Sequence, residues 1–207
     1  MRALIDGGPF VWLLVGLSLA SLTFILERGW ALRRSRVMPR ALLDALADGD
    51  AERLRNACLA NPSPLGRLIT SVLDHLPWSR TENVAALEVR ARQEIAGLER
   101  GLVVLEIVVG IAPLLGLVGT IYGIIPLLGD FGKNVQADNA FIARGMSIAL
   151  YKTVIGLIVA MPTLAAWSFF NKQVELLGLD LESVCDALLR RHYLGRREEA
   201  SEPSPRP

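Results

Sequence analysis

Two threonines and one lysine are the residues that could do chemistry inside the longest apolar stretches of the sequence. Thr120 lies in a run of about 28 residues at 101–128, and Thr153 in a run of about 26 at 145–170, where roughly 20 suffice to cross a bilayer. Glu106 and Lys152 are the single charges of these two runs. Because a hydroxyl both donates and accepts hydrogen bonds, the threonines could bind each other, water or the carboxylate of a partner.

The spacing predicts that the two hydroxyls lie at one depth. Thr120 stands eight residues before Leu128, and Thr153 eight residues after Gly145. At about 1.5 Å per residue, both lie roughly 12 Å beneath the outer surface if the two runs are antiparallel helices. In the alternative interpretation, each hydroxyl bonds to a carbonyl of its own helix, as Ser and Thr commonly do in membrane spans.

Lys152 is the most costly residue of these runs, since a lysine at the centre of a span costs about 2.5–3.5 kcal/mol on insertion scales. At roughly 10 Å depth its long stem could reach the outer interface. Alternatively, it points into the helix bundle and pairs with a carboxylate. Glu106 is predicted at the cytoplasmic interface, about 20 Å away, so it is not an obvious partner.

Small residues recur along both runs and indicate places where helix backbones approach closely. Such density suits ordinary packing within one copy, or a narrow central passage in an assembly of several copies. The positions in question are Gly110, Ala112, Gly116, Gly119 and Gly123 in the first run, and Ala149, Gly156, Ala160 and Ala165 in the second; Pro113, Ile148 and Pro162 complete the predicted pore-lining or packing set.

The composition points to a membrane protein. Mean hydropathy is +0.38 and 52% of the 207 residues are hydrophobic, which is high for a soluble domain. A net charge of +1 argues against a nucleic-acid partner. The two cysteines, Cys58 and Cys185, lack ligand-type neighbours and are expected to be free thiols, and the isolated His75 and His192 do not suggest a metal site.

A third apolar run at residues 9–28 is predicted to be an uncleaved anchor, because arginines follow it and no A-x-A-like cleavage site precedes Glu27. These arginines favour an outer N-terminus and a cytoplasmic C-terminus. All but four of the 22 lysines and arginines then lie on the cytoplasmic side; the exceptions are Arg2, Lys133, Arg144 and Lys152.

The predicted architecture is therefore an all-α membrane protein with three transmembrane helices and long helices that extend into the cytoplasm. The segments, in order, are an outer N-terminus (1–8), the first span (9–28), a cytoplasmic helical insert (37–100), the second span (101–128), an outer loop (129–144), the third span (145–170), a cytoplasmic C-terminal helix (171–198) and a disordered tail (199–207).

Capping signals predict the helices of the insert. Pro39 and Gly49 bracket a first helix, Asp50 caps a second, and Ser63 opens a third. The sequence SRTE from Ser79 fits a capping box. Beyond it no Pro or turn cluster intervenes, so one long helix is predicted from about residue 80 to residue 128.

The two spans resemble the MotA/TolQ/ExbB proton-channel family. The paired segments APLLGLVGTIYGII and ALYKTVIGLIVAMP look like the family's signature, and the outer N-terminal anchor ending in Glu-Arg and the helical insert agree with it. The likeness covers about residues 9–190. Its size and single insert are more similar to ExbB and TolQ than to MotA, whose cytoplasmic insert is larger.

The resemblance implies a pentamer in the bacterial inner membrane, whose second and third spans line a pore around the single-span helix of an ExbD/TolR-type partner. That helix would carry a membrane aspartate that accepts and releases protons, and Thr120 and Thr153 match the family's pore threonines. No cofactor is implied besides protons as the coupling ion. Two positions depart from the pattern: Ile148 stands where some relatives have a glutamate, and Lys152 where a small or neutral residue is usual.

The predicted function is thus a subunit of a motor or energiser, driven by the proton-motive force, for biopolymer transport or envelope work, with no enzymatic step. Two other classes are weighed against it. One is a non-conducting membrane scaffold subunit of a transport complex, which would need no aspartate in its partner's span. The other is a permease subunit, which would need a nucleotide-hydrolysing partner, since this chain has no phosphate-cradling loop.

Overall fold

The computed structural model describes the backbone of residues 9–131 and 139–201, and the side chains of residues 9–129 and 143–193. Within these ranges the chain is helical and contains no strand. The predicted outer N-terminus (1–8), the middle of the predicted outer loop (132–138) and the last part of the predicted tail (202–207) lie outside the described residues.

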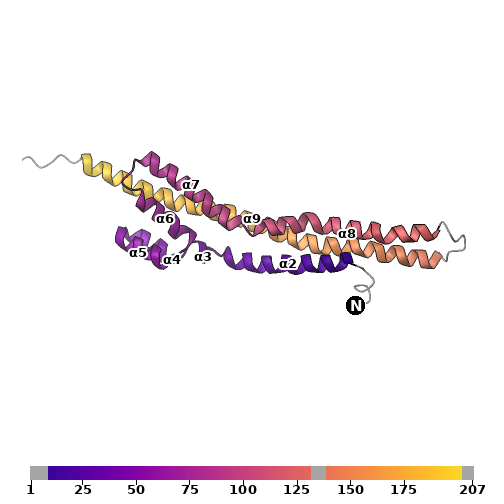
Figure 1. The fold of residues 1–207 in the computed structure, drawn as a ribbon. Helices are drawn as coiled ribbons and strands as arrows, with labels where there is room; N and C mark the ends of the chain where they lie inside the picture. Colours follow the sequence, from indigo (N-terminus) through magenta and orange to yellow (C-terminus); the bar gives the residue numbers. More distant parts are fainter. Residues whose placement is uncertain (1–8, 132–138, 202–207) are drawn as a thin grey trace, which may run out of the picture. The chain divides into compact units, whose positions relative to one another are not determined.

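The chain divides into two compact units. Figure 1 colours the chain along its sequence and labels its helices. Residues 1–29 and 101–170 form what we call the spanning unit; residues 30–100 and 171–207 form the insert unit.

Three helices of the structure are long and apolar enough to cross a membrane, as the sequence predicted. They are α2 (Pro9–Ala31), α8 (Leu102–Phe131) and α9 (Asn139–Ser201). Pro113 and Pro126 lie inside α8 and Pro162 inside α9. The orientation of the three spans in a membrane stays a prediction.

In the spanning unit, α2 and α8 run antiparallel. The rings of Phe10 and Tyr122 are 5.5 Å apart at one end, and the Arg28 guanidinium lies against Gly101 at the other. We call the end at which α2 begins and α8 ends the distal end; the predicted topology places it outside. Side chains of all three helices form the apolar cluster of this unit: Leu14, Val108, Ala112, Val159 and Ala160.

The insert unit contains α3 (Arg34–Val37), α4 (Arg40–Asp48), α5 (Ala51–Ala60), α6 (Pro64–Asp74), α7 (Arg80–Glu99) and the second part of α9. The predicted caps are confirmed. Asp50 accepts from the amides of Glu52 and Arg53, Ser63 accepts from that of Gly66, and Gly49 ends α4 at a φ of 76°. Both halves of the Ser79–Glu82 capping box are present.

The single long helix predicted from residue 80 to 128 is wrong. The structure ends α7 at Glu99 and begins α8 at Leu102. Gly101, a poor helix former, lies at the interruption, and the Arg28 side chain occupies the space that a Cβ would need there.

The third span and the predicted C-terminal helix are one continuous helix, α9, which runs to Ser201. Residues 199–201, predicted as the start of a disordered tail, are therefore helical. Helix ends also reach into the predicted outer loop from both sides, to Phe131 and from Asn139.

Candidate functional site

Gly116 of α8 and Gly156 of α9 bring the two helix backbones into direct contact. A Cβ at Gly156 would lie 2.6 Å from the Ala112 carbonyl oxygen and 3.1 Å from the Gly116 Cα. A Cβ at Gly116 would lie 2.9 Å from the Lys152 carbonyl oxygen. Since these neighbours are backbone atoms, no rotamer change could make room, and the contact requires glycine on both helices.

One helical turn nearer the distal end than this glycine contact, the hydroxyl groups of Thr120 and Thr153 lie next to each other. Thr120 Oγ1 and Thr153 Oγ1 are 2.5 Å apart. Thr120 is also within hydrogen-bond distance of the carbonyl oxygens of Gly116 (3.0 Å) and Ala149 (3.1 Å), and Thr153 of the Gly116 carbonyl oxygen (3.3 Å). The two hydroxyls thus contact each other, and Thr120 also contacts a carbonyl of its own helix, as the alternative interpretation expected; the carbonyl that Thr153 contacts belongs to α8 and not to its own helix.

The hydroxyl pair has more acceptors than protons. Two hydroxyl hydrogens face two carbonyl oxygens and each other's oxygen, so either threonine can donate to the other while the other donates to a carbonyl. The pair can therefore reverse its direction of donation without moving a heavy atom. It can orient or relay a proton, but it holds no charge of its own.

The pair lies on the side of the α8–α9 contact away from α2. On α9, Val159 packs in the cluster that contains Leu14 of α2, whereas Thr153 lies on the other side of Gly156 and is half-buried. Thr120 is buried, at 7% exposure. A group approaching α8 and α9 from that side would meet the Thr153 hydroxyl first.

Lys152 takes a different direction from its neighbour Thr153. Its side chain is 7% exposed and lies along the face of α8 that carries Gly119 and Gly123. The Lys152 Cδ is 3.2 Å from the point that a Cβ at Gly119 would occupy, and the Lys152 Nζ is 3.4 Å from the point that a Cβ at Gly123 would occupy. The Cβ of Phe10, in α2, is 3.3 Å from the same point, the place that a Cβ at Gly119 would occupy. Lys152 is therefore packed between α8 and α2 and does not lie on the lipid-facing surface of the spanning unit.

No hydrogen bond or ion pair joins Lys152 to another residue in the described part of the chain. Glu106, the single charge of the apolar run at 101–128, is exposed and lies in the first turns of α8, far from the distal end. The structure thus brings Thr120 and Thr153 together, and it leads the Lys152 ammonium away from them.

The remaining predicted residues lie around this contact to different extents. Ala149 and Ala160 are buried, Ile148 and Pro113 are half-buried, and Pro162 is exposed. Sequence reasoning missed Phe10 and the carbonyl oxygens of Gly116 and Ala149. The carbonyls follow from helix geometry once the contact is known, but no sequence signal indicated Phe10.

In the insert unit, an ion-paired cluster joins α6 to α7. Glu94 is buried and receives two hydrogen bonds from the Arg67 guanidinium, at 2.5 and 2.8 Å, and an ion pair from Arg90 at 3.1 Å. The Glu94 carboxylate raises the pKa of Arg67 above its ordinary value. These groups satisfy one another and hold the two helices together.

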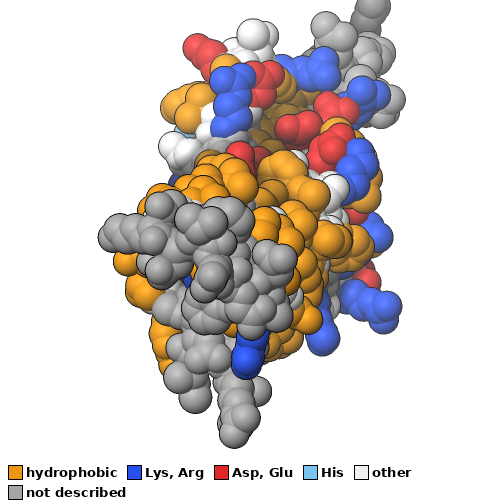
Figure 2. Space-filling view, turned by 90° about the vertical axis from the view of Figure 1, so that its right-hand side faces the viewer, with side chains coloured by type: hydrophobic (Ala, Val, Ile, Leu, Met, Phe, Trp, Pro, Cys, Tyr) orange, Lys and Arg blue, Asp and Glu red, His pale blue; other side chains and the backbone are white. Residues whose placement is uncertain are grey.

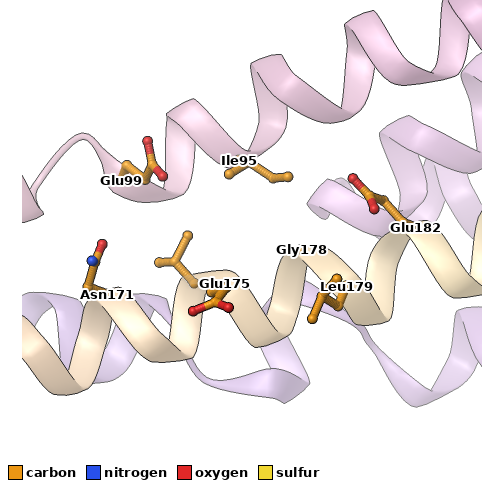
Figure 3. Close-up of a pocket in the computed structure, with 8 residues that line it drawn as sticks. Ile95, Glu99, Asn171, Glu175, Gly178, Leu179 and Glu182 are labelled. Carbon is orange, nitrogen blue, oxygen red and sulfur yellow. The ribbon is translucent and has the colours of Figure 1, made fainter.

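A cavity of about 390 Å³ lies between α7 and α9 in the same unit (Figure 3). Its rim carries the carboxylates of Glu99, Glu175 and Glu182, and its floor includes Ile95 against Gly178. Lys172 neutralises Glu175 at 2.9 Å. Nothing in the lining suggests catalysis.

Both cysteines are free and buried, as expected from the sequence. Burial raises the pKa of the Cys185 thiol to about 12, with a further contribution from the nearby Glu182 carboxylate. Burial also raises the pKa of Cys58, against a smaller opposite effect of its hydrogen bond with Thr70. Neither thiol is suited to nucleophilic chemistry.

The fold and the hydroxyl pair define a three-span helical membrane protein in which Thr120 and Thr153 meet between two spans. The profile of the MotA/TolQ/ExbB proton channel family matches residues 61–183, more than half of the chain, and the chain belongs to this family. The family is one of transport channels and energisers, not of enzymes. Membership and the three apolar helices assign the chain to the inner membrane.

Among curated relatives, the similarity is to ExbB and TolQ. The chain is 28% identical over 200 residues to the biopolymer transport protein ExbB of Neisseria meningitidis, covering 87% of this chain and 89% of that protein. It is 30% identical over 179 residues to the Tol-Pal system protein TolQ of Pseudomonas aeruginosa, covering 79% and 78%. A putative ExbB homologue of Methanothermobacter thermautotrophicus is 29% identical over 176 residues; the match covers 82% of this chain but only 62% of that protein.

Proposed function

We propose that the chain is the ring-forming subunit of a motor driven by the proton-motive force in the bacterial inner membrane. Several copies, five by family likeness, surround the span of an ExbD/TolR-type partner, and proton passage turns or shifts that partner to drive transport or envelope work. Protons are the coupling ion, and no bound cofactor takes part.

The observation that carries this proposal is the hydroxyl pair of the buried Thr120 and the half-buried Thr153 at the α8–α9 contact. Its hydroxyls can reverse their direction of donation, which is what a group must do if it hydrogen-bonds a carboxylate in both its protonated and its ionised form. An ionised carboxylate only accepts, and a protonated one also donates. The pair can satisfy either state without a change of helix geometry.

The chain itself supports the need for a partner. In the described part of the chain no carboxylate is hydrogen-bonded to Thr120 or Thr153, and Glu106, the acidic residue of the span Leu102–Gly129, lies in the first turns of α8. A hydroxyl cannot store a proton at neutral pH, so a titrating carboxylate supplied by another polypeptide would complete the pair.

The test is proton flux into proteoliposomes that contain the chain and the product of the adjacent gene, after co-purification and counting of both chains by native mass spectrometry. Thr153→Val keeps the shape and removes the hydroxyl, whereas Thr153→Ser keeps the hydroxyl. We expect a loss of at least about tenfold for the valine variant, the worth of a hydrogen bond to a charged group, and near-normal flux for serine.

The same measurement separates the alternatives. A scaffold subunit would co-purify with its partner, show no flux above empty vesicles, and support biological function equally well with Thr120→Val and Thr153→Val. Replacing the proton gradient by a sodium gradient distinguishes the coupling ion. Equal flux in the valine and serine variants would refute the proposed role of the hydroxyl pair.

A further inference from the structure

Another cavity of the insert unit is lined by residues of α5, α6 and α7. Its volume is about 410 Å³, and sites for small molecules typically measure about 300–1,000 Å³. Part of its wall is apolar, since Leu59, which is 75% exposed, and Pro62 line it. Arg67 of α6 and Arg90 of α7 line it as well. The cavity therefore places positive charge next to exposed apolar surface.

The two arginines share one carboxylate. Glu94 is buried, and both Arg67 and Arg90 pair with it. Because one carboxylate faces two guanidinium groups, these three side chains together keep a net charge of +1. The side chains of Arg67 and Arg90 are 43% and 39% exposed, whereas that of Glu94 is 9% exposed. The positive groups of the cluster are therefore accessible, and its negative group is covered.

The acidic residue Asp74 also lines the cavity but does not cancel this excess. Arg55 pairs with Asp74 at 2.5 Å, so that three arginines stand against two carboxylates. Figure 2 shows acidic and basic side chains intermixed on one face of the molecule. The unequal number of arginines and carboxylates at the cavity is therefore a local feature and does not reflect a generally basic surface.

A guanidinium group has more N–H donors than the shared Glu94 carboxylate takes up, and such donors form charge-assisted hydrogen bonds with an oxyanion. We infer that the cavity binds a small monocarboxylate, in which one carboxylate is attached to an apolar group. The carboxylate contacts Arg67 and Arg90, and the apolar group lies against Leu59 and Pro62. This inference does not rest on proton conduction, because every residue that it uses belongs to the insert unit.

The net charge of the cluster favours a carboxylate over a phosphate. A single negative charge matches the excess of +1 and leaves the cluster neutral. A phosphate dianion would leave one uncompensated negative charge close to the buried Glu94, where like charges repel each other and water screens them less than at the surface.

The experiment is isothermal titration calorimetry on the full-length protein in detergent, with micelles that lack protein as the blank. The probes are 4-phenylbutyrate, its uncharged analogue 4-phenylbutanol, and acetate, which lacks the apolar group. We expect 4-phenylbutyrate to bind at least about tenfold more tightly than either of the other two probes, because it alone offers both the charge and the apolar group. This comparison uses the wild-type chain and does not require a variant to fold.

Three variants then assign the binding to the charge of the cluster. Arg90→Gln makes the cluster neutral but keeps the Arg67–Glu94 pair, and we expect it to weaken binding of 4-phenylbutyrate at least about tenfold. Glu94→Gln raises the net charge to +2 and should strengthen binding at least about threefold. Arg92→Gln is the matched control, since Arg92 is an exposed arginine of the same helix that pairs with Glu88, and it should bind as the wild type does.

Four results would overturn the inference. The first is the absence of saturable binding of 4-phenylbutyrate to the wild type, and the second is equal binding of 4-phenylbutanol. The third is unchanged binding in Arg90→Gln. The fourth is weaker binding in Glu94→Gln, which would show that the ion pairs only maintain the shape of the cavity and that their net charge attracts no ligand. Tighter binding of phenyl phosphate than of 4-phenylbutyrate would contradict the assignment to a monocarboxylate.

Discussion

Adding one methyl group at the α8–α9 contact should separate the two helices and disrupt the hydroxyl pair. In Gly156→Ala the new Cβ would lie 2.6 Å from the Ala112 carbonyl oxygen, where ordinary contacts begin at about 3.4 Å, so the backbones must part by roughly 0.8 Å. Overpacking of this kind costs about 1–3 kcal/mol. The Thr153–Gly116 hydrogen bond, already 3.3 Å long, would be lost.

Gly110→Ala is the matched control for this substitution. Gly110 lies on α8, and nothing approaches within 4 Å of the position of its Cβ. Both variants gain about 1 kcal/mol of helix propensity, so their difference isolates the contact.

The assay is the free energy of unfolding in mixed micelles titrated with SDS, followed by tryptophan fluorescence. We expect Gly156→Ala to be about 1–3 kcal/mol less stable than Gly110→Ala, and its proton flux to fall with that of Thr153→Val. Equal unfolding free energies for the two alanine variants would refute the argument that backbone contact at Gly156 positions the hydroxyls.

Three further predictions concern the insert unit. Glu94→Gln removes a carboxylate that is paired with two arginines. We expect it to destabilise the insert unit by about 2 kcal/mol, measured by chemical denaturation followed by circular dichroism. The same unfolding free energy for the variant and the wild type would mean that these ion pairs make no net contribution to stability. Ser79→Ala should destabilise α7, because it removes the capping hydrogen bonds of Ser79. These hydrogen bonds lower the pKa of Glu82, so the stability that they give is present above the ordinary pKa of a glutamate and is lost as the pH falls through the lowered pKa. The difference in unfolding free energy between Ser79→Ala and the wild type should therefore shrink in acid. The third prediction concerns the Cys185 thiol, whose pKa is about 12, in a variant with Cys58 replaced by Ser. At pH 8 this thiol should react with a maleimide more than about 100-fold more slowly in the native protein than in urea. Fast labelling of the native protein would contradict the burial of Cys185.

The insert helices could be predicted from the sequence because each end is set by a local signal. Asp50 and Ser63 cap the turn that immediately follows them, and Gly49 supplies the positive φ that ends α4. The interruption between α7 and α8 could not be predicted in this way. Gly101 differs from other glycines of the spans through its contact with Arg28, more than 70 residues earlier in the chain, and that contact exists only in the folded unit.

The depth of the candidate site could also be predicted by counting residues, since the rise of a helix is fixed. The direction of each side chain could not, because it depends on how the helices are rotated about their axes. Gly156 and Gly116 determine that rotation by the closeness of their contact. Several small residues satisfied the same pattern, and the sequence alone did not distinguish Gly116 from Gly110, which makes no such contact.

The rotation of α9 about its axis sends Lys152 and Thr153 in different directions. Successive residues of a helix point about 100° apart, so two neighbours at a helix contact face opposite sides of it. Here Thr153 lies on the side away from α2, with Thr120, and Lys152 lies on the side that packs against Phe10. The lysine is a neighbour of the threonine in the sequence, but in the structure it belongs to the packing between α2 and α8. Lys152 therefore bears on the packing of α2 against α8 more directly than on proton transfer at the hydroxyl pair, and comparing the unfolding free energy with the proton flux of Lys152→Met measures the two effects separately.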